Sequence, residues 1–500
     1  MLKQIIFSNE ITLWWTKDEF DYADCYKLYL DGKLVGETNK THYSFLSLCA
    51  EKTYEICIEA YKGEKLINKQ CFSLTTSKAK KCIDITKEPY NAVGDGKTMN
   101  TQAIQKAFND CTENDYVYFP AGTYLTGALD LHSNTELYLD KGAVLQGSEN
   151  PNDYLPKIKS RFEGIERMCY RSLLNIGDLD NKGGYNCKNV TIKGKGCIFG
   201  GGRPLALNTI ANEKERFKTH PEEFPDDIAA CECADTPFGR ARGRLLNISN
   251  CENVILSGVD VGYGPAWNVH FIYSKDITTY GCIIRSNKWY DKDGNIIKEN
   301  VWNGDGWDPD SSENCAIFDT EFVTGDDCVA IKSGKNPEGN IVNRPTKNVY
   351  IFDCKTNEGH SIAIGSEMSG GVENVYVWDC DLKNCNMGVQ IKATRERGGY
   401  VRNVNVRDSQ MKSIYVRAKV NYNNDGEAAK TLPVLENYSY ENVELYGHEE
   451  NGQIHYIYLE GYEEKGHRLT NVNIKNVNLV GAKQGEGIYQ DCVENINIKN

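Results

Sequence analysis

The chain has 500 residues, of which 40% are hydrophobic and 25% charged, and its formal net charge is −13. This composition is typical of a folded protein, and the length exceeds what one compact core usually holds, so we expect several domains or an elongated repeat. The negative charge disfavours nucleic acid and anionic membranes as partners, and no stretch approaches the roughly 18 apolar residues of a membrane span.

The first ten residues contain one lysine and no apolar run that could serve as a secretory signal. The chain has 19 cysteines, an odd number. Together these features predict reduced thiols and a cytoplasmic protein. The pair Cys231 and Cys233 comes nearest to a metal-binding pattern, but two thiols cannot fill a tetrahedral site. We therefore predict no metal and no cofactor.

Residues 1–82 are predicted to form a small β-sandwich. The segments Ile11–Trp15, Tyr26–Leu30 and Tyr54–Tyr61 alternate apolar and polar residues, with turn residues between them. An early tryptophan and a later tyrosine-rich strand make this part similar to a fibronectin type III domain. It offers no catalytic group by composition, so we expect a spacer or docking module, followed by a polar linker at 75–81.

The pattern changes in the second part, residues 83–500. Asn100 or Thr101 is placed to cap a helix, because an apolar residue recurs at helical spacing after it. Strands are predicted at 117–124 and 136–145. A helix followed by strand after strand indicates the beginning of a solenoid.

A short repeat then continues to the end of the chain. From Val349 onward its steps are 26, 29, 39, 29 and 24 residues. A fixed strand in coils of variable length is typical of a parallel β-helix, in which Cys354 and Cys380 would lie inside the coil. The predicted fold class is therefore all-β, with a parallel β-helix over 83–500 preceded by the small sandwich. The repeats begin at Asn189, Asn253, Asn348, Asn374, Asn403, Asn442, Asn471 and Asn495.

Three strands of this repeat can be aligned by their alternation: Val329–Lys332, Ile362–Gly365 and Val389–Lys392. Their β-branched residues are expected to point into the coil, because successive side chains of a strand face opposite sides. Gln390 and Lys392 are then expected to point outward.

Acidic and basic residues collect around these strands. Asp326 and Asp327 precede the first strand, His360 precedes the second, and Asp305 lies about one coil before Asp326. Because stacked coils are about 4.8 Å apart, these groups and Lys392 are predicted to lie along one outer face within about 15 Å. An isolated Asp-Asp pair is more often a solvated turn, but carboxylates this close would repel one another and spread their pKa values.

At these residues the chain resembles glycoside hydrolase family 28, the polygalacturonases, over roughly residues 83–500. The motifs of that family are Asn-Thr-Asp, Gly-Asp-Asp, Gly-His-Gly and Arg-Ile-Lys, in that order. The resemblance implies a right-handed parallel β-helix that hydrolyses glycosidic bonds. The matching segments are Asn303-Gly304-Asp305, Gly325-Asp326-Asp327, Gly359-His360-Ser361 and Gln390-Ile391-Lys392.

The resemblance also implies a role for each residue. Asp326 would be the general acid, and Asp305 and Asp327 would hold and activate the attacking water. His360 would support protonation of the acid, and Lys392 would bind the carboxylate of the sugar. We expect the two neighbouring carboxylates to raise the pKa of Asp326 above its ordinary value.

Three positions depart from the motifs: Gly304, Ser361 and Gln390. Gln390 matters most, because arginine binds a carboxylate through two parallel hydrogen bonds and glutamine does not. Arginines at 395–402 are candidates to restore positive charge, although a solvated loop would look the same.

Further substrate-binding candidates are Asn303, Arg395, Trp267 and His270, besides Gln390 and Lys392. A tryptophan is suited to stacking on a sugar ring, although a tryptophan in a solenoid is more often part of the core. The alternating arginines Arg240, Arg242 and Arg244 line the cleft or face solvent.

The predicted function is an inverting glycosidase that cleaves α-1,4-linked galacturonate oligomers, with an acidic oligosaccharide or polysaccharide as its partner. The sandwich and a long insertion at 203–240 make the chain similar to exo-acting members, in which inserted loops block one end of the groove. Two alternatives stay open: a pectate lyase that eliminates with Ca²⁺ and an arginine base, and a β-helix that only binds carbohydrate.

Overall fold

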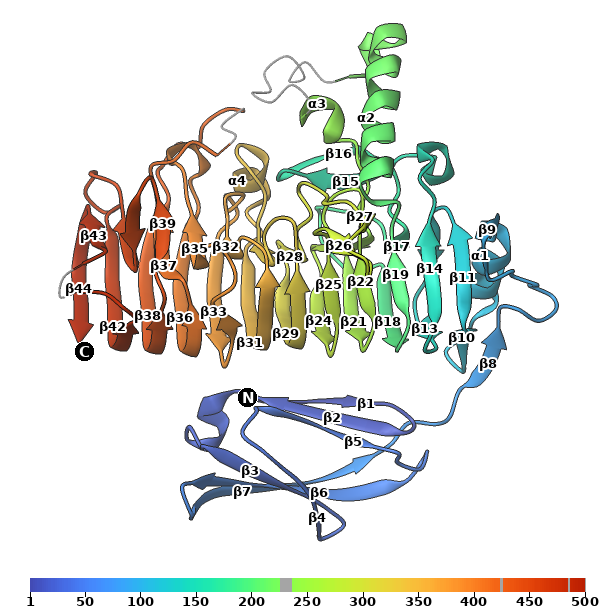
Figure 1. Ribbon diagram of the computed structural model, residues 1–500, viewed down its shortest axis with the longest axis horizontal. Helices are drawn as coiled ribbons and strands as arrows, with labels where there is room; N and C mark the ends of the chain where they lie inside the picture. Colours follow the sequence, from blue (N-terminus) through green and yellow to red (C-terminus); the bar gives the residue numbers. More distant parts are fainter. Residues whose placement is uncertain (225–235, 423–425, 484–485, 500) are drawn as a thin grey trace. The chain divides into compact units, whose positions relative to one another are not determined.

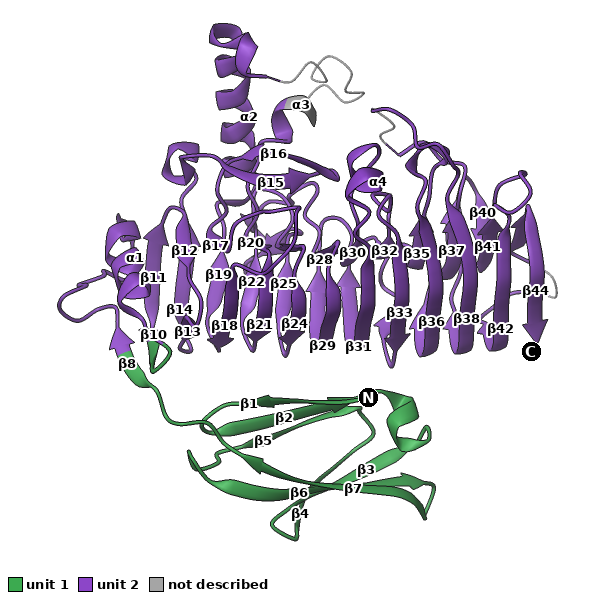
Figure 2. Cartoon of the chain, turned by 180° about the vertical axis from the view of Figure 1, so that it is seen from behind, with its two compact units in different colours: residues 1–82, 113–116 green, residues 83–112, 117–500 purple. Residues whose placement is uncertain are grey.

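The computed structural model describes residues 1–224, 236–422, 426–483 and 486–499. The chain divides into two compact units (Figure 2), one of residues 1–82 with 113–116 and one of residues 83–112 with 117–500. The segment 231–233, with the two cysteines considered above as metal ligands, lies outside the described residues.

The first unit is a sandwich of two antiparallel sheets, as predicted. One sheet has the order β1-β2-β5 and the other β4-β3-β6-β7. Trp15, Phe20 and Tyr26 pack edge to face in the core between the sheets. The likeness to fibronectin type III stays a prediction. The strands are β1 (Leu2–Ile6), β2 (Glu10–Trp15), β3 (Cys25–Leu30), β4 (Lys33–Thr38), β5 (His42–Leu46), β6 (Thr53–Lys62) and β7 (Lys65–Thr75).

A disulfide joins Cys57 of β6 to Cys71 of β7, so the prediction that every cysteine is reduced is wrong for this pair. The two residues face each other directly in the antiparallel pairing of the strands, and their Cα atoms are 4.1 Å apart. An odd number of cysteines does not show which of them meet, because the pairing depends on the register of the two strands.

The second unit is a parallel β-helix, which confirms the predicted fold class. Each coil contributes to a twenty-stranded sheet and to an eleven-stranded parallel sheet, which we call the site sheet (Figure 1). The strands of the site sheet are β12 (Leu129–Leu131), β17 (Leu174–Ile176), β20 (Leu246–Ser249), β23 (Val269–Ile272), β28 (Trp307–Asp310), β30 (Val329–Ile331), β32 (Ser361–Ile364), β35 (Gly388–Lys392), β37 (Ser413–Arg417), β41 (Ile457–Glu460) and β43 (Ile488–Asp491).

The larger sheet runs along the same stack of coils. Its strands are β8 (Lys81–Asp84), β9 (Asp95–Met99), β10 (Asp115–Phe119), β11 (Gly122–Thr126), β13 (Glu136–Leu139), β14 (Ala143–Gly147), β18 (Cys187–Gly194), β19 (Cys197–Phe199), β21 (Cys251–Ser257), β22 (Asp260–Gly262), β24 (Lys275–Tyr280), β25 (Ile283–Arg285), β29 (Glu313–Val323), β31 (Thr346–Glu358), β33 (Val372–Trp378), β34 (Asp381–Leu382), β36 (Tyr400–Met411), β38 (Val434–Leu445), β42 (Leu469–Leu479) and β44 (Val493–Lys499). Each of the two strands predicted at 117–124 and 136–145 is in fact two strands with a corner between them.

One apolar core fills the interior of the coils. Inward positions are β-branched or aliphatic residues, and Cys354 and Cys380 lie among them, as predicted. Burying this surface on every coil is the main force that holds the stack together.

Asparagines mark one corner of the coils. Their side chains form a ladder, as in the step from Asn374 to Asn348, where Nδ2 lies 3.0 Å from Oδ1. Each adopts a positive φ, which asparagine tolerates better than most residues. The predicted repeat is wrong at Asn442, because Tyr438 pairs with Val404, so the next rung is Asn437. Asn442 belongs to a second corner, where it donates to Asp408.

Among the described residues, one helix, α1, lies at the N-terminal end of the coils and the others lie along one side (Figure 1). Asn100 does not cap the first helix with its side chain but accepts a hydrogen bond from Val93 N at 2.7 Å. Among the described residues, no helix is both long and apolar enough to cross a membrane. The helices are α1 (Thr101–Asp110), α2 (Gly202–Thr219), α3 (Thr236–Gly239) and α4 (Glu338–Val342).

Candidate active site

The site lies on the outer face of the site sheet, at strands β28, β30, β32 and β35. The strands pair in the predicted register, with Ala330 beside Ala363 and Ala363 beside Gln390. Val329 and Ile331 belong to the core, whereas the small Ala330 faces outward between them. The β30 to β35 alignment made from the sequence is therefore correct.

Asp305, just before β28, is almost fully buried and is paired with Lys332. The Lys332 Nζ donates to its Oδ2 at 3.0 Å. Burial raises the pKa of Asp305 to about 7, and the charges of Asp326 and Asp327 act in the same direction, while Lys332 opposes them. Of Asp305 and Asp326, Asp305 is thus the one that holds its proton better near neutral pH.

Lys332 was not among the predicted site residues. Its ammonium also lies 3.6 Å from Asp308 Oδ2 and 4.0 Å from Glu367 Oε2, and 3.4 Å from the centroid of the Trp267 ring. Its carboxylate neighbours hold its pKa above the ordinary value although burial acts against this. The signal was present in the sequence, because Lys332 has the same place in its strand as Lys392.

Asp326 pairs with His360 across neighbouring coils. The His360 Nδ1 lies 3.1 Å from Asp326 Oδ1, and the amide of Asp327 donates to the same oxygen at 2.9 Å. Burial acts to raise the pKa of Asp326, but His360, Lys392 and this amide outweigh it and the pKa is lowered. The predicted raised pKa is therefore wrong. The hydrogen bond to Asp326 raises the pKa of His360, so this pair stores a proton on the imidazole.

Asp327 is held from two sides. The Lys392 Nζ donates to its Oδ2 at 2.7 Å and the Ser361 hydroxyl donates to its Oδ1 at 2.8 Å. Ser361 and Gln390, two of the departures from the family motifs, are neighbours, with Ser361 Oγ 3.4 Å from Gln390 Oε1. The serine thus adds a donor to Asp327, and the glutamine leaves this coil without a second cation.

Gly325 sits where no side chain fits. A Cβ there would lie 2.0 Å from Asn300 Oδ1, and the φ of Gly325 is not positive. The glycine before the Asp-Asp pair is therefore required by close packing and not by a left-handed backbone conformation.

Trp267 and His270 are not placed to meet a substrate. Trp267 is 2% exposed, and its ring stacks on Phe162 at 5.0 Å and lies under Lys332. His270 is fully buried, and its Nε2 lies 3.3 Å from Asp310 Oδ2. Burial lowers the pKa of His270 to about 3. Both residues support the floor of the site, so the prediction that they bind substrate is wrong.

The remaining candidates are distributed differently. Asn303 lies beside the cluster and accepts from Arg242 Nη2 at 2.7 Å. Arg242 is buried, as are Arg240 and Arg244, so none of the three arginines faces solvent. Arg395 is half exposed and forms ion pairs with Glu463 and Glu464, with no contact to the carboxylate cluster among those described.

A hairpin bounds the site on the side of the earlier coils. Strands β15 (Ile158–Phe162) and β16 (Ile165–Cys169) cross the outer face of the site sheet (Figure 1). Ser160 donates to Asn247 on β20 at 2.8 Å, and Arg161 Nη1 donates to Asp310 on β28 at 2.7 Å. The sequence pattern does not predict this hairpin, and the prediction that the insertion at 203–240 blocks one end of the groove stays a prediction, because residues 225–235 lie outside the described part of the chain.

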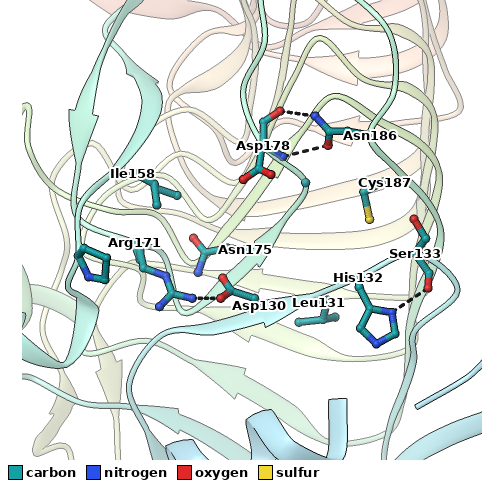
Figure 3. Close-up of a pocket in the computed structure, with 12 residues that line it drawn as sticks. Asp130, Leu131, His132, Ser133, Ile158, Arg171, Asn175, Asp178, Asn186 and Cys187 are labelled. Carbon is teal, nitrogen blue, oxygen red and sulfur yellow. Dashed lines mark hydrogen bonds and ion pairs between the residues drawn. The ribbon is translucent and has the colours of Figure 1, made fainter. Parts of the chain in front are cut away.

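Two cavities flank these elements. One of about 270 Å³ opens beside His360, between Gly325 and Asn386. A larger one, of about 640 Å³, lies on the earlier strands β12 and β17 (Figure 3). Asp130, Asn175 and Ile158 line it, so the hairpin stands between this cavity and the carboxylate cluster.

The cluster combines groups that can donate and accept protons. One oxygen each of Asp326 and Asp327 and a ring nitrogen of His360 lie within 4.8 Å of one another, a spacing that could also hold a metal ion. The Lys392 ammonium already neutralises the charge of Asp327, and its own positive charge disfavours binding of a divalent cation there. The arrangement suits acid and base catalysis by carboxyl groups.

The comparisons with known families agree with this chemistry. The model described as "Glycosyl hydrolases family 28" matches residues 182–497. A second model, described as "Rhamnogalacturonase A/epimerase, pectate lyase-like", matches residues 87–150, in the first coils.

Two curated relatives carry related names. The chain is 31% identical over 340 residues to a "Probable polygalacturonase" of Vitis vinifera, which is 65% of this chain and 60% of the relative. It is 27% identical over 365 residues to the "Exo-poly-alpha-D-galacturonosidase" of Dickeya chrysanthemi, which is 69% of this chain and 58% of that protein. The chain thus spans about three fifths of the length of these relatives.

Solved structures share the fold. The Yersinia enterocolitica family 28 exopolygalacturonase superposes with a TM-score of 0.83 over 100% of this chain and 99% of its own, at 22% identity. The exopolygalacturonase of Thermotoga maritima gives 0.61 over 84% and 92%, at 25% identity. The family model covers every residue of the carboxylate cluster, and we conclude that the chain belongs to glycosyl hydrolases family 28.

Proposed function

We propose that the protein is an exo-acting, inverting glycoside hydrolase that cleaves α-1,4-galacturonosyl linkages of oligogalacturonides. The observation that carries this is the cluster of Asp305, Asp326 and Asp327 with its paired cations on one outer face of the β-helix. A solenoid does not need such a cluster to fold, and burying charges without a use is costly. The names of the curated relatives support the same substrate class.

In the proposed mechanism Asp326 protonates the glycosidic oxygen as the bond to the anomeric carbon breaks. The proton comes from the pair with His360, whose imidazole holds it in the free enzyme. Water attacks the opposite face of the sugar and gives its proton to Asp327. The nearest oxygens of Asp326 and Asp327 lie within 4.8 Å of one another, closer than the roughly 6.5–9.5 Å usual between acid and base in inverting enzymes, so the anomeric configuration of the product has to be measured.

The hairpin β15–β16 supports exo action. It crosses the sheet next to the carboxylate cluster and is fixed there by the buried ion pair of Arg161 with Asp310. A polymer could then extend from the cluster in one direction only. We propose that the enzyme removes short products from one chain end.

The alternative is elimination by a pectate lyase-type reaction, which needs a base to remove the proton at C5. No arginine contacts the three carboxylates among the contacts described, and the cations that do are Lys332, Lys392 and His360. This favours hydrolysis.

Product analysis on oligogalacturonides tests the proposal. We expect a saturated mono- or disaccharide of inverted anomeric configuration, detected by NMR in the first minutes of reaction. Asp326→Asn should lose about 10²–10⁴-fold in turnover and keep substrate binding, because a general acid contributes on that scale. The exposed Asp293→Asn serves as the control and should keep full activity.

Three outcomes would overturn it. An ultraviolet-absorbing unsaturated product would favour the lyase, and binding without turnover would favour a carbohydrate-binding β-helix. Near-normal turnover of Asp326→Asn would remove the assignment of roles.

A further inference from the structure

The cations around the carboxylate cluster are already engaged by the protein. Lys332 is paired with Asp305 and Lys392 with Asp327, each at hydrogen-bond distance. The third, His360, is paired with Asp326. A galacturonide brings its own carboxylate into a protein of net charge −13, so its recognition needs a cation beyond these three pairs.

Arg417 is in the position to supply it. It ends strand β37 and pairs in register with Lys392 on the neighbouring coil, so the two residues point from the same side of the sheet. Its side chain is 23% exposed. Neighbouring coils are about 4.8 Å apart, which is short compared with the reach of an arginine side chain.

The guanidinium is held by Glu450 and by a hydrogen bond with Tyr422. Its Nη1 lies 3.2 Å from Glu450 Oε1, whereas its buried Nε has no hydrogen-bond partner. Tyr415 packs beside the guanidinium, 5.6 Å from its centre, and also donates to Glu450, which fixes the orientation of the arginine.

Tyr422 connects Arg417 to the cluster. Burial raises the pKa of this phenol, and the charges of Arg417 and Lys392 lower it while that of Asp327 raises it. The hydroxyl therefore lies within electrostatic range of all three groups, which places the guanidinium at the edge of the site and not on a remote surface.

We propose that Arg417 is the specificity-determining residue that binds the carboxylate of a uronide next to the cleaved bond. Arg417 then supplies, from the neighbouring coil, the positive charge that Gln390 does not provide. In the sheet, Gln390 lies between Ala363 on one neighbouring strand and Tyr415 on the other. The inference rests on the proposed function and adds which group selects for the acid.

The test compares oligogalacturonides with the same oligomers as methyl esters. For Arg417→Gln we expect kcat/KM on the acid to fall about 10–100-fold, the scale of a charged hydrogen bond, while the ester is affected much less. The preference for acid over ester should fall by the same factor. Adding Gln390→Arg to this variant should restore part of the preference. Arg468→Gln, another arginine paired with a glutamate, is the control and should change the rate on neither substrate.

A second variant covers the possibility that Arg417→Gln folds poorly. Glu450→Gln frees Nη1 of Arg417 and should lower KM for the acid with no matching change for the ester. An equal loss on both substrates in Arg417→Gln, or an unchanged preference in both variants, would overturn the inference. A wild-type enzyme that cleaves neither substrate would instead overturn the proposed function.

Discussion

The pKa values of Asp305 and Asp326, on neighbouring coils, are shifted in opposite directions because the partners of the two carboxyl groups differ. Asp305 is enclosed, and the single ammonium of Lys332 is shared with Asp308 and Glu367. Asp326 keeps a quarter of its side chain exposed and has His360 to itself. Burial therefore prevails at Asp305 and pairing prevails at Asp326.

This difference predicts how stability depends on pH. The folded-state pKa of Asp305, about 7, lies above the ordinary value of 3.8, so its contribution is full below pH 4 and is lost as the pH rises toward 7. Asp305→Asn removes that loss. At pH 7.5 we expect the free energy of unfolding to rise by on the order of 2–4 kcal/mol, since each pKa unit corresponds to about 1.4 kcal/mol. At pH 4 the variant should match the wild type.

Asp310→Asn provides the opposite case. Burial acts to raise the pKa of Asp310, but Arg161 and His270 hold it below the ordinary value. Its stabilisation is present above pH 4, so this variant should lose stability at pH 7.5. Denaturant unfolding at both pH values measures the two effects. Destabilisation of Asp305→Asn at pH 7.5 would contradict the account of the buried acid.

The sequence predicted which residues share the site, and not how they pair. Alternation in three strands was enough to place Gln390 and Lys392 outward, because the period of a strand is fixed. Spacing gives the coil on which a residue lies but not the direction of its side chain. The pairing of His360 with Asp326 and the burial of Trp267 under Lys332 depend on that direction.

Among the elements, the hairpin β15–β16 departs most from the repeat. Its sequence does not share the repeat of the coils, so the repeat does not predict it. The asparagine ladder shows the converse limit: Asn437 and Asn442 lie five residues apart on one strand, and both have a positive φ. The local pattern fits either one, and only the pairing of Tyr438 with Val404 decides between them.

The hairpin should be sensitive to its buried ion pair. Arg161→Ala leaves Asp310 buried with His270, Ser311 and the amide of Gly334 as its remaining partners. Breaking such a pair costs roughly 3–5 kcal/mol. We expect a lower Tm and, as the hairpin loosens, products of mixed length in place of short ones. Lys159→Ala removes an ion pair with Glu166 in which the lysine is half exposed, and it should change the Tm little. Short products from a destabilised Arg161→Ala would show that the hairpin does not determine the mode of attack.

At the scale of the whole molecule, the two units rest on different kinds of stabilisation. The β-helix buries a continuous core on every coil, so the period of the sequence was sufficient to predict it. The sandwich has a much smaller core, around Trp15, and its disulfide. Small domains gain more from such a bond, because their cores supply less of the stability.

The disulfide gives a prediction that separates the units. Cys57 and Cys71 are 14 residues apart, and closing a loop of about 15 residues in the unfolded chain contributes about 3 kcal/mol. Cys57→Ser should lower the Tm of the sandwich and leave turnover of the β-helix unchanged, whereas Cys49→Ser, at an exposed thiol, should change neither the Tm nor the turnover. Thiol titration of the unfolded, unreduced protein should find two fewer groups than the 19 cysteines of the chain. If all 19 react, the pair is reduced in the native protein and the cytoplasmic prediction from the sequence gains support.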